Sequence, residues 1–144
     1  MTVTSPSPQT VAARAAQPAR ILLYSDNELV RNLVKDTIGD AIGAAGTPIE
    51  WTEVATAPIA VRLAQQGEYD LMILDNETSK LGGVGLVREL RAELSWQPTV
   101  LLLLAREQDA WLAAWSGADA AVLQPVDPFE LVSQVARLLD IPEA

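Results

Sequence analysis

Short apolar runs recur along the chain from Ile21 onward, and segments with helical periodicity separate them. Each run has the length of a β-strand, and most contain few polar positions. A continuous apolar run is typical of a strand that is covered on both faces. The pattern therefore predicts five strands, at Ile21–Tyr24, Ile49–Val54, Leu71–Leu74, Thr99–Leu104 and Ala120–Leu123.

Apolar residues that repeat every three or four positions predict a helix after each strand. These helices are expected at residues 27–42, 58–66, 84–94, 107–116 and 128–139. The first carries its apolar period at Leu29, Val30, Leu33, Val34, Ile38, Ala41 and Ile42. Asn27 can cap the start of this helix, and Gly43 follows its last apolar residue.

Five alternating strand and helix units predict an α/β fold with a doubly wound, five-stranded parallel sheet in the order 2-1-3-4-5. The first and fifth helices are expected on one side of the sheet and the second to fourth on the other. Ligands of such folds bind beyond the carboxyl ends of the strands. The candidate site residues are therefore Ser25, Asp26, Asp75, Leu104 and Gln124, which end or follow four of the strands.

The N-terminal segment differs in composition from the rest of the chain. Residues 1–19 are rich in Ser, Thr, Ala, Gln and Pro and show no apolar period, so they bury too little surface to offset the entropy of ordering. They are predicted to form a flexible tail before a single domain at residues 20–144, and a tail that folds on a partner is the alternative. No apolar run approaches the roughly 20 residues that cross a bilayer, and no export signal is evident. We expect a cytoplasmic protein.

Composition excludes several kinds of chemistry. The 144 residues include no cysteine and no histidine, which rules out disulfides, thiol nucleophiles, common zinc sites and histidine-dependent relays. The formal net charge is −9, and residues 21–144 alone carry −11, because Arg14 and Arg20 precede them. So acidic a surface argues against direct binding of nucleic acid and suits a partner with basic patches.

Four segments, taken in order, resemble the receiver domain of bacterial two-component response regulators. They are ILLYSDNELVRNLV, YDLMILDNETSKLGGVGLVRELR, PTVLLLLAR and GADAAVLQPVDPFELVSQVARLL, and the similarity covers residues 20–140. The resemblance implies a phosphoacceptor at Asp75. It also implies Mg²⁺ contacts from Asp26, Asp75 and the main-chain carbonyl of Glu77. Since Ser25 stands where the family has a second acid, only weak binding of Mg²⁺ is expected, and no other cofactor.

Four positions depart from the family pattern. Ser25 replaces an acid, Leu104 a hydroxyl residue, Ala121 the aromatic residue that rotates on activation, and Gln124 a lysine. Loss of the lysine removes positive charge from the phosphoryl clamp, where electrostatic stabilisation matters most. We therefore expect a non-enzymatic domain with a degenerate switch and a vestigial Asp75. The alternative is an active single-domain response regulator that is phosphorylated on Asp75.

The stretches YSDN, LDNETSKLGGVG and DAWLAAWSGADAAVLQPVDP are similar to a narrower group within the family. These are stand-alone receiver-like proteins of actinobacteria that are associated with the proton-pumping type I NADH dehydrogenase. The resemblance implies an accessory or regulatory subunit that contacts the cytoplasmic arm of that complex. It would then be peripheral to the inner face of the plasma membrane, held there by its protein partner.

Trp111 and Trp115 are four residues apart on a predicted helix and therefore share a face. Core packing and partner binding both remain open, because large aromatic residues dominate cores as well as interface hot spots. We select this pair as the candidate docking residues. The arginines Arg88 and Arg91 are expected on a solvated helix face. The segment Gly82–Gly85 lacks the spacing of a phosphate-binding loop and predicts a flexible turn into a helix.

Overall fold

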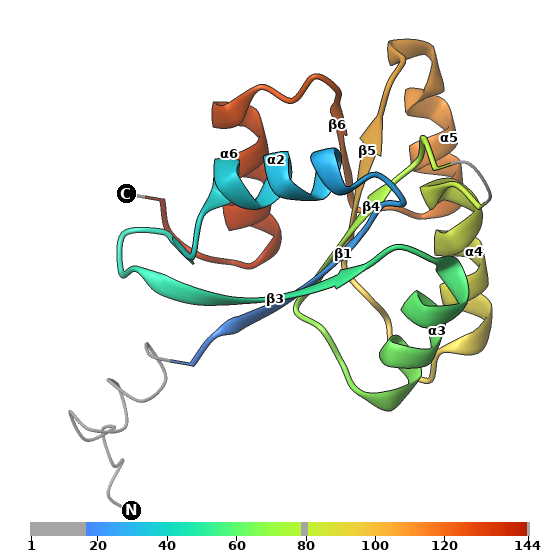
Figure 1. Ribbon diagram of the computed structural model, residues 1–144, viewed down its shortest axis with the longest axis horizontal. Coiled ribbons are helices and arrows are strands. Elements are labelled where there is room, and N and C mark those ends of the chain that lie inside the picture. Colours follow the sequence, from blue (N-terminus) through green and yellow to red (C-terminus); the bar gives the residue numbers. More distant parts are fainter. Residues whose placement is uncertain (1–16, 79–80, 144) are drawn as a thin grey trace, which may run out of the picture.

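Six strands form one sheet in the order β2-β3-β1-β4-β5-β6 (Figure 1). This computed structural model describes residues 17–78 and 81–143. The strands are β1 (Ala19–Tyr24), β2 (Ala41–Ile42), β3 (Thr47–Val54), β4 (Leu71–Asp75), β5 (Val100–Leu104) and β6 (Ala120–Leu123). All neighbours are parallel except β2, which pairs antiparallel with β3. The predicted five parallel strands and their order are confirmed, with β2 added at the edge.

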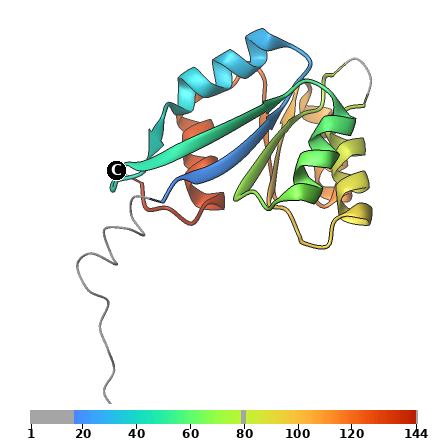
Figure 2. The ribbon, with the colours of Figure 1, turned by 60° about the horizontal axis from the view of Figure 1, so that its bottom comes forward.

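Helices cover both faces of the sheet. They are α2 (Glu28–Ile38), α3 (Ala57–Gln66), α4 (Gly83–Glu93), α5 (Ala110–Ser116) and α6 (Pro128–Leu138), and a short 3-10 turn, Glu107–Asp109, leads into α5. Helices α2 and α6 lie together on one face, and α3, α4 and α5 lie on the other (Figures 1 and 2). This is the predicted division of the helices between the two faces.

The alternation of side chains along the strands divides the core into two parts. In β1, Leu22 points to the face of α3, α4 and α5, whereas Ile21 and Leu23 point to the face of α2 and α6. Strands β4 and β5 repeat this alternation, and all their apolar residues are buried. Burial on both faces explains why these strands read as unbroken apolar runs.

The C-terminal boundary predicted for the first helix, at residue 42, is wrong. Helix α2 ends at Ile38, because Gly39 adopts a φ of +88° and its N–H donates to the carbonyl of Lys35. The next residues turn back so that Ile42 pairs with Thr47 on β3 and is buried. Its apolar side chain therefore belongs to a hairpin and not to the helix. Within α2, the expected apolar face is also incomplete, because Leu29 and Leu33 are exposed.

At its N-terminal end the domain begins slightly earlier than expected. Ala19 is the first residue of β1, pairs with Ile49 and is buried, although it was assigned to the tail. The rest of the predicted tail, up to residue 16, lies outside the described residues. In the described part of the chain, no helix is long and apolar enough to cross a membrane.

The two glycines at the start of α4, Gly82 and Gly83, allow the helix to pack closely against the sheet. A Cβ atom on Gly83 would lie 2.6 Å from a methyl group of Leu102 and 3.0 Å from the carbonyl oxygen of Leu74. A Cβ atom on Gly82 would approach the backbone of Asn76 to 2.7 Å. The first turn of α4 thus packs closely against β4 and β5, and Gly82 and Gly83 form the predicted turn into a helix.

Candidate functional site

Three residues from three different strand ends meet at the carboxyl edge of the sheet. The Asp75 carboxylate accepts a hydrogen bond from the Ser25 hydroxyl at 2.7 Å (Oδ2) and another from the Gln124 side-chain amide at 3.1 Å (Oδ1). The backbone N–H of Glu77 also donates to Oδ1, at 2.9 Å. Parallel strands bring these side chains together because their carboxyl ends share one edge.

Asp75 and Ser25 are buried within this cluster, and Gln124 is half-buried. Asp75 is 2% exposed and Ser25 is fully buried. Every buried side-chain polar atom in the described part of the chain has a hydrogen-bond partner. Both oxygens of Asp75 therefore accept hydrogen bonds from neutral donors of the described residues, and these bonds stabilise a buried carboxylate.

The two substitutions that flank Asp75 complement each other. An acid in place of Ser25 would put a second carboxylate against Asp75, and like charges at this distance need a cation between them. A serine hydroxyl instead donates to Asp75. The amide of Gln124 supplies a second donor without adding charge. From the sequence, Ser25 and Gln124 were interpreted as separate losses, and only the structure shows that they bind the same carboxylate.

The expected Mg²⁺ ligands do not form a cation cluster. Among residues 17–78 and 81–143, no group of three or more acidic side chains is arranged to hold a metal ion. Asp26 is exposed and has a polar contact of its own, and both oxygens of Asp75 accept hydrogen bonds from the protein. Asp26, Asp75 and the carbonyl of Glu77 would offer Mg²⁺ only two carboxylates, so weak binding of Mg²⁺ stays a prediction.

The other two departures from the family pattern lie on the face of α3, α4 and α5. Leu104 is buried in the apolar core at the end of β5, where it offers no hydrogen-bond donor to Asp75. Ala121 is half-buried on β6 and packs against the same core. Both side chains contribute apolar contacts at positions where a receiver would carry its switch.

Two side-chain hydrogen bonds hold the described residues on either side of the start of α4. The Tyr24 hydroxyl donates to the carbonyl of Leu81 at 2.6 Å, and the Asn76 side chain accepts from the N–H of Val84 at 3.0 Å. Tyr24 itself is buried at the end of β1. These contacts hold the start of α4 close to the acidic edge of the sheet.

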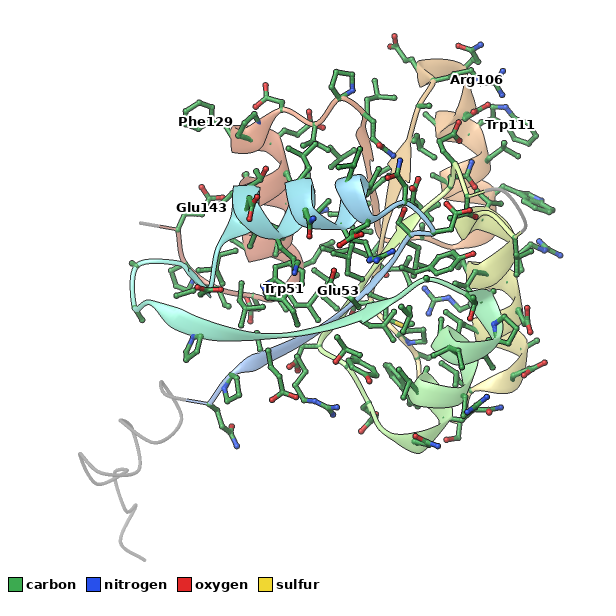
Figure 3. The ribbon with its side chains drawn as sticks, in the orientation of Figure 1. Trp51, Glu53, Arg106, Trp111, Phe129 and Glu143 are labelled. Carbon is green, nitrogen blue, oxygen red and sulfur yellow. The ribbon has the colours of Figure 1, made fainter. Side chains whose placement is uncertain are left out.

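The four tryptophans fall into two pairs. Trp51 and Trp96 are half-buried, and each indole N–H donates to a main-chain carbonyl, of Gly39 and Ala64 respectively. Trp111 and Trp115 on α5 are 65% and 58% exposed. Figure 3 shows Trp111 directed outward from α5, on the side of the molecule away from Phe129. The choice left open by the sequence is thus resolved against core packing for the second pair.

Cations accompany the exposed tryptophans. The Arg88 guanidinium lies 4.0 Å from the centre of a Trp115 ring, a cation–π contact that holds the indole on the surface. Arg91 donates to the carbonyls of Pro98 and Gly117 and pairs with Asp119 at 3.6 Å. The two arginines were expected on a solvated face, but Arg91 instead ties α4 to the loops around α5.

One titratable group outside the acidic site is clearly perturbed. A hydrogen bond from Lys35, at 2.9 Å, lowers the pKa of Glu53, and Arg31 lowers it further, while partial burial opposes both. Figure 3 shows Glu53 between β3 and α2. The pair of cations therefore fastens α2 to the edge of the sheet.

Comparison with known proteins identifies the family. A response regulatory protein of Mycobacterium tuberculosis is 42% identical over 123 residues, which make up 85% of this chain and 92% of that protein. The response regulator PmrA of Pseudomonas aeruginosa is 34% identical over 125 residues, which make up 83% of this chain and 52% of that protein. No protein-family model matches the chain.

Solved structures with a similar fold agree with this. The receiver domain of Francisella response regulator 1452 aligns with a TM-score of 0.71 at 21% identity, over 86% of this chain and 98% of that one. The chemotaxis response regulator CheY4 of Vibrio cholerae aligns with a TM-score of 0.71 at 22% identity, over 85% and 99%. Together with the 42% identity to a full-length relative, this fold shows that the chain belongs to the response regulator receiver family.

Proposed function

We propose that this receiver domain is a non-enzymatic accessory or regulatory subunit that docks on a protein partner through α5. The partner is the cytoplasmic arm of type I NADH dehydrogenase, and the phosphorylation switch is degenerate. The observation that carries the proposal is the exposure of Trp111 and Trp115 on one short helix. Tryptophan is the residue most enriched at interface hot spots, and two exposed copies are costly unless a partner covers them.

The arrangement around Asp75 supports the loss of the switch. A phosphoacceptor must present one carboxylate oxygen to the incoming phosphorus, and a cation must neutralise the phosphoryl oxygens. Here Ser25 and Gln124 occupy the oxygens of Asp75, and neither carries charge. At the position where the family has a hydroxyl group, Leu104 has no polar atom with which to sense a phosphoryl group. Asp75 then acts as the centre of a structural hydrogen-bond cluster.

The charge of the domain favours a basic partner. Residues 21–144 carry a formal net charge of −11, which attracts a basic surface over several ångströms and orients the approach. Arg88 provides a local positive charge beside Trp115. The choice of NADH dehydrogenase as the partner rests on the similarity of YSDN, LDNETSKLGGVG and DAWLAAWSGADAAVLQPVDP to receiver-like proteins associated with that complex.

The test is affinity purification of the tagged chain from gently solubilised native membranes, with copurifying proteins quantified by mass spectrometry. We expect subunits of NADH dehydrogenase in near-stoichiometric amounts with the wild-type chain, and their loss with a Trp111→Ala/Trp115→Ala variant. Phe129→Ala is the matched control, because Phe129 is an aromatic residue on α6 that is even more exposed than the two tryptophans. Recovery of the bare protein, or equal loss with all variants, would contradict the proposal.

The second candidate function is conventional signalling through Asp75. It is supported by the position of Asp75 at the end of β4, where the fold presents a carboxylate at the ligand-binding edge. Copurification of a sensor kinase, together with a phosphoryl group on Asp75, would favour this function over the accessory subunit.

A further inference from the structure

A hollow of about 630 Å³ lies beside the acidic edge of the sheet. It is lined by the end of β1 and the loop after it, by the loop after β3 with the first turn of α3, and by Leu81 before α4 and Glu89 on α4. Its walls are mainly apolar and include the side chains of Tyr24, Pro58, Ile59 and Leu81. The volume is within the range of small-molecule sites, roughly 300–1,000 Å³. It is therefore large enough for a compact organic ligand.

The charged side chains that line the hollow among the described residues are acidic. Asp26 and Glu89 line it, and no lysine or arginine does so among the residues that the structure describes. Glu89 is half-buried on α4 and forms no hydrogen bond or ion pair with any described residue. Asp26 has a polar contact of its own, so Glu89 is the carboxylate available to a ligand.

The wall of the hollow is also well fixed. Tyr24 is held by the hydrogen bond of its hydroxyl to the carbonyl of Leu81, which lines the opposite loop. Ile59, on the first turn of α3, is about a third exposed and therefore accessible to a ligand. A preformed apolar wall lowers the entropic cost of binding.

We infer that this hollow binds a small organic cation with an apolar body, such as an aryl-alkyl amine. The apolar body would pack against Pro58, Ile59 and Leu81, and the ammonium group would pair with Glu89. Because residues 21–144 carry a formal net charge of −11, the domain concentrates cations and repels phosphates, nucleotides and other anions. The site does not depend on Trp111 and Trp115, which lie on α5 and line no part of it.

Three probes of similar shape and different charge test the inference. They are phenethylamine, phenethyl alcohol and hydrocinnamate, each titrated into the isotope-labelled full chain while the backbone amides are followed by NMR. We expect saturable shifts at Ala55 and Ala57, tightest binding for the amine, and no binding for the carboxylate. The amine should bind about three- to fivefold more tightly than the alcohol, as for a partly exposed ion pair.

Variants assign the effect to the hollow. Glu89→Gln should remove the preference for the amine over the alcohol, whereas Glu93→Gln, an exposed position on the same helix, should leave it unchanged. Ile59→Trp should fill the hollow and abolish binding of both probes. Equal binding of the three probes, shifts confined to other surfaces, an unaltered preference in Glu89→Gln or no saturable shift would each overturn the inference.

Discussion

The carboxyl edge of the sheet and helix α5 differ in which kinds of side chain they bury and which they expose. At the edge, a carboxylate is 2% exposed, and neutral donors occupy both of its oxygens. On α5, two indole rings are more than half exposed. In most soluble domains charged groups are exposed and large aromatic groups are buried.

This difference indicates where the domain carries out its function. A buried, fully paired carboxylate contributes to stability and has little capacity left to bind a ligand. Exposed tryptophans contribute little to stability and retain their capacity to bind. We therefore propose that the edge around Asp75, where a receiver performs its chemistry, is structural in this chain and that recognition takes place on α5.

The largest expected effect is on the folding of the acidic site. Asp75→Ala should lower the free energy of unfolding by about 3 kcal/mol, because it leaves the Ser25 hydroxyl, the Gln124 amide and the Glu77 N–H without their acceptor. Asp75→Asn retains one acceptor oxygen and should cost less. Urea denaturation measures both. A neutral or stabilising Asp75→Ala would indicate a repelled carboxylate that awaits a cation, and would contradict the structural assignment.

The second-largest effect concerns the affinity for the partner, with little change in the stability of the fold. Trp111→Ala/Trp115→Ala should weaken the partner complex by at least about 30-fold, the size of a hot-spot loss, and change the free energy of unfolding by less than about 1 kcal/mol. Binding to the purified partner and urea denaturation measure the two quantities. A large loss of stability would show that the indoles belong to the core after all.

A third prediction concerns the packing that joins the two regions. Gly83→Ala should destabilise the domain by about 1–3 kcal/mol, because its Cβ atom would overlap Leu102 and the carbonyl of Leu74. Gly67→Ala is the matched control, since the nearest atom to its Cβ is 3.7 Å away and its backbone is extended. Equal thermal midpoints for the two variants would contradict the close approach of α4 to the sheet.

The smallest effect depends on pH. Because the folded state lowers the pKa of Glu53 below 4.5, its ion pairs stabilise the domain above that value, and this contribution is lost as the pH falls through the lowered pKa. Glu53→Gln should therefore cost up to about 0.5 kcal/mol at neutral pH, since the carboxylate is a third exposed. The free energies of unfolding of the wild type and of Glu53→Gln should converge once the pH falls below the lowered pKa of Glu53. A difference in the free energy of unfolding that persists at that low pH would exclude the ionisation of Glu53 as the cause of the difference.

Most of the fold could be predicted because the strands are buried on both faces. Such strands leave a plain signal, an apolar run followed by a helical period. The prediction failed at Ala41–Ile42, where the same apolar residues suit a helix or a hairpin and the backbone of Gly39 decides between them. Local pattern could not reveal which φ value Gly39 adopts.

The candidate site was predicted only in part. The position of each strand end located Ser25, Asp75 and Gln124, but the sequence could not show that the side chains of Ser25 and Gln124 bind one carboxylate. That fact depends on distances between residues about 50 positions apart. The apolar hollow at Glu89 left no signal, because its lining comes from four separate segments. The Mg²⁺ affinity and the partner remain predictions.

Phosphorylation of the wild-type chain tests the central claim most directly. The full chain is incubated with acetyl phosphate and excess Mg²⁺ and measured by intact mass, with Asp75→Asn as the negative control and a receiver that retains both acids as the positive control. The hydrogen-bonded cluster around Asp75 predicts that the mass of the wild-type chain stays unchanged while the positive control gains one phosphoryl group. A phosphoryl adduct on the wild-type chain that is absent from Asp75→Asn would contradict the account and establish Asp75 as a working phosphoacceptor.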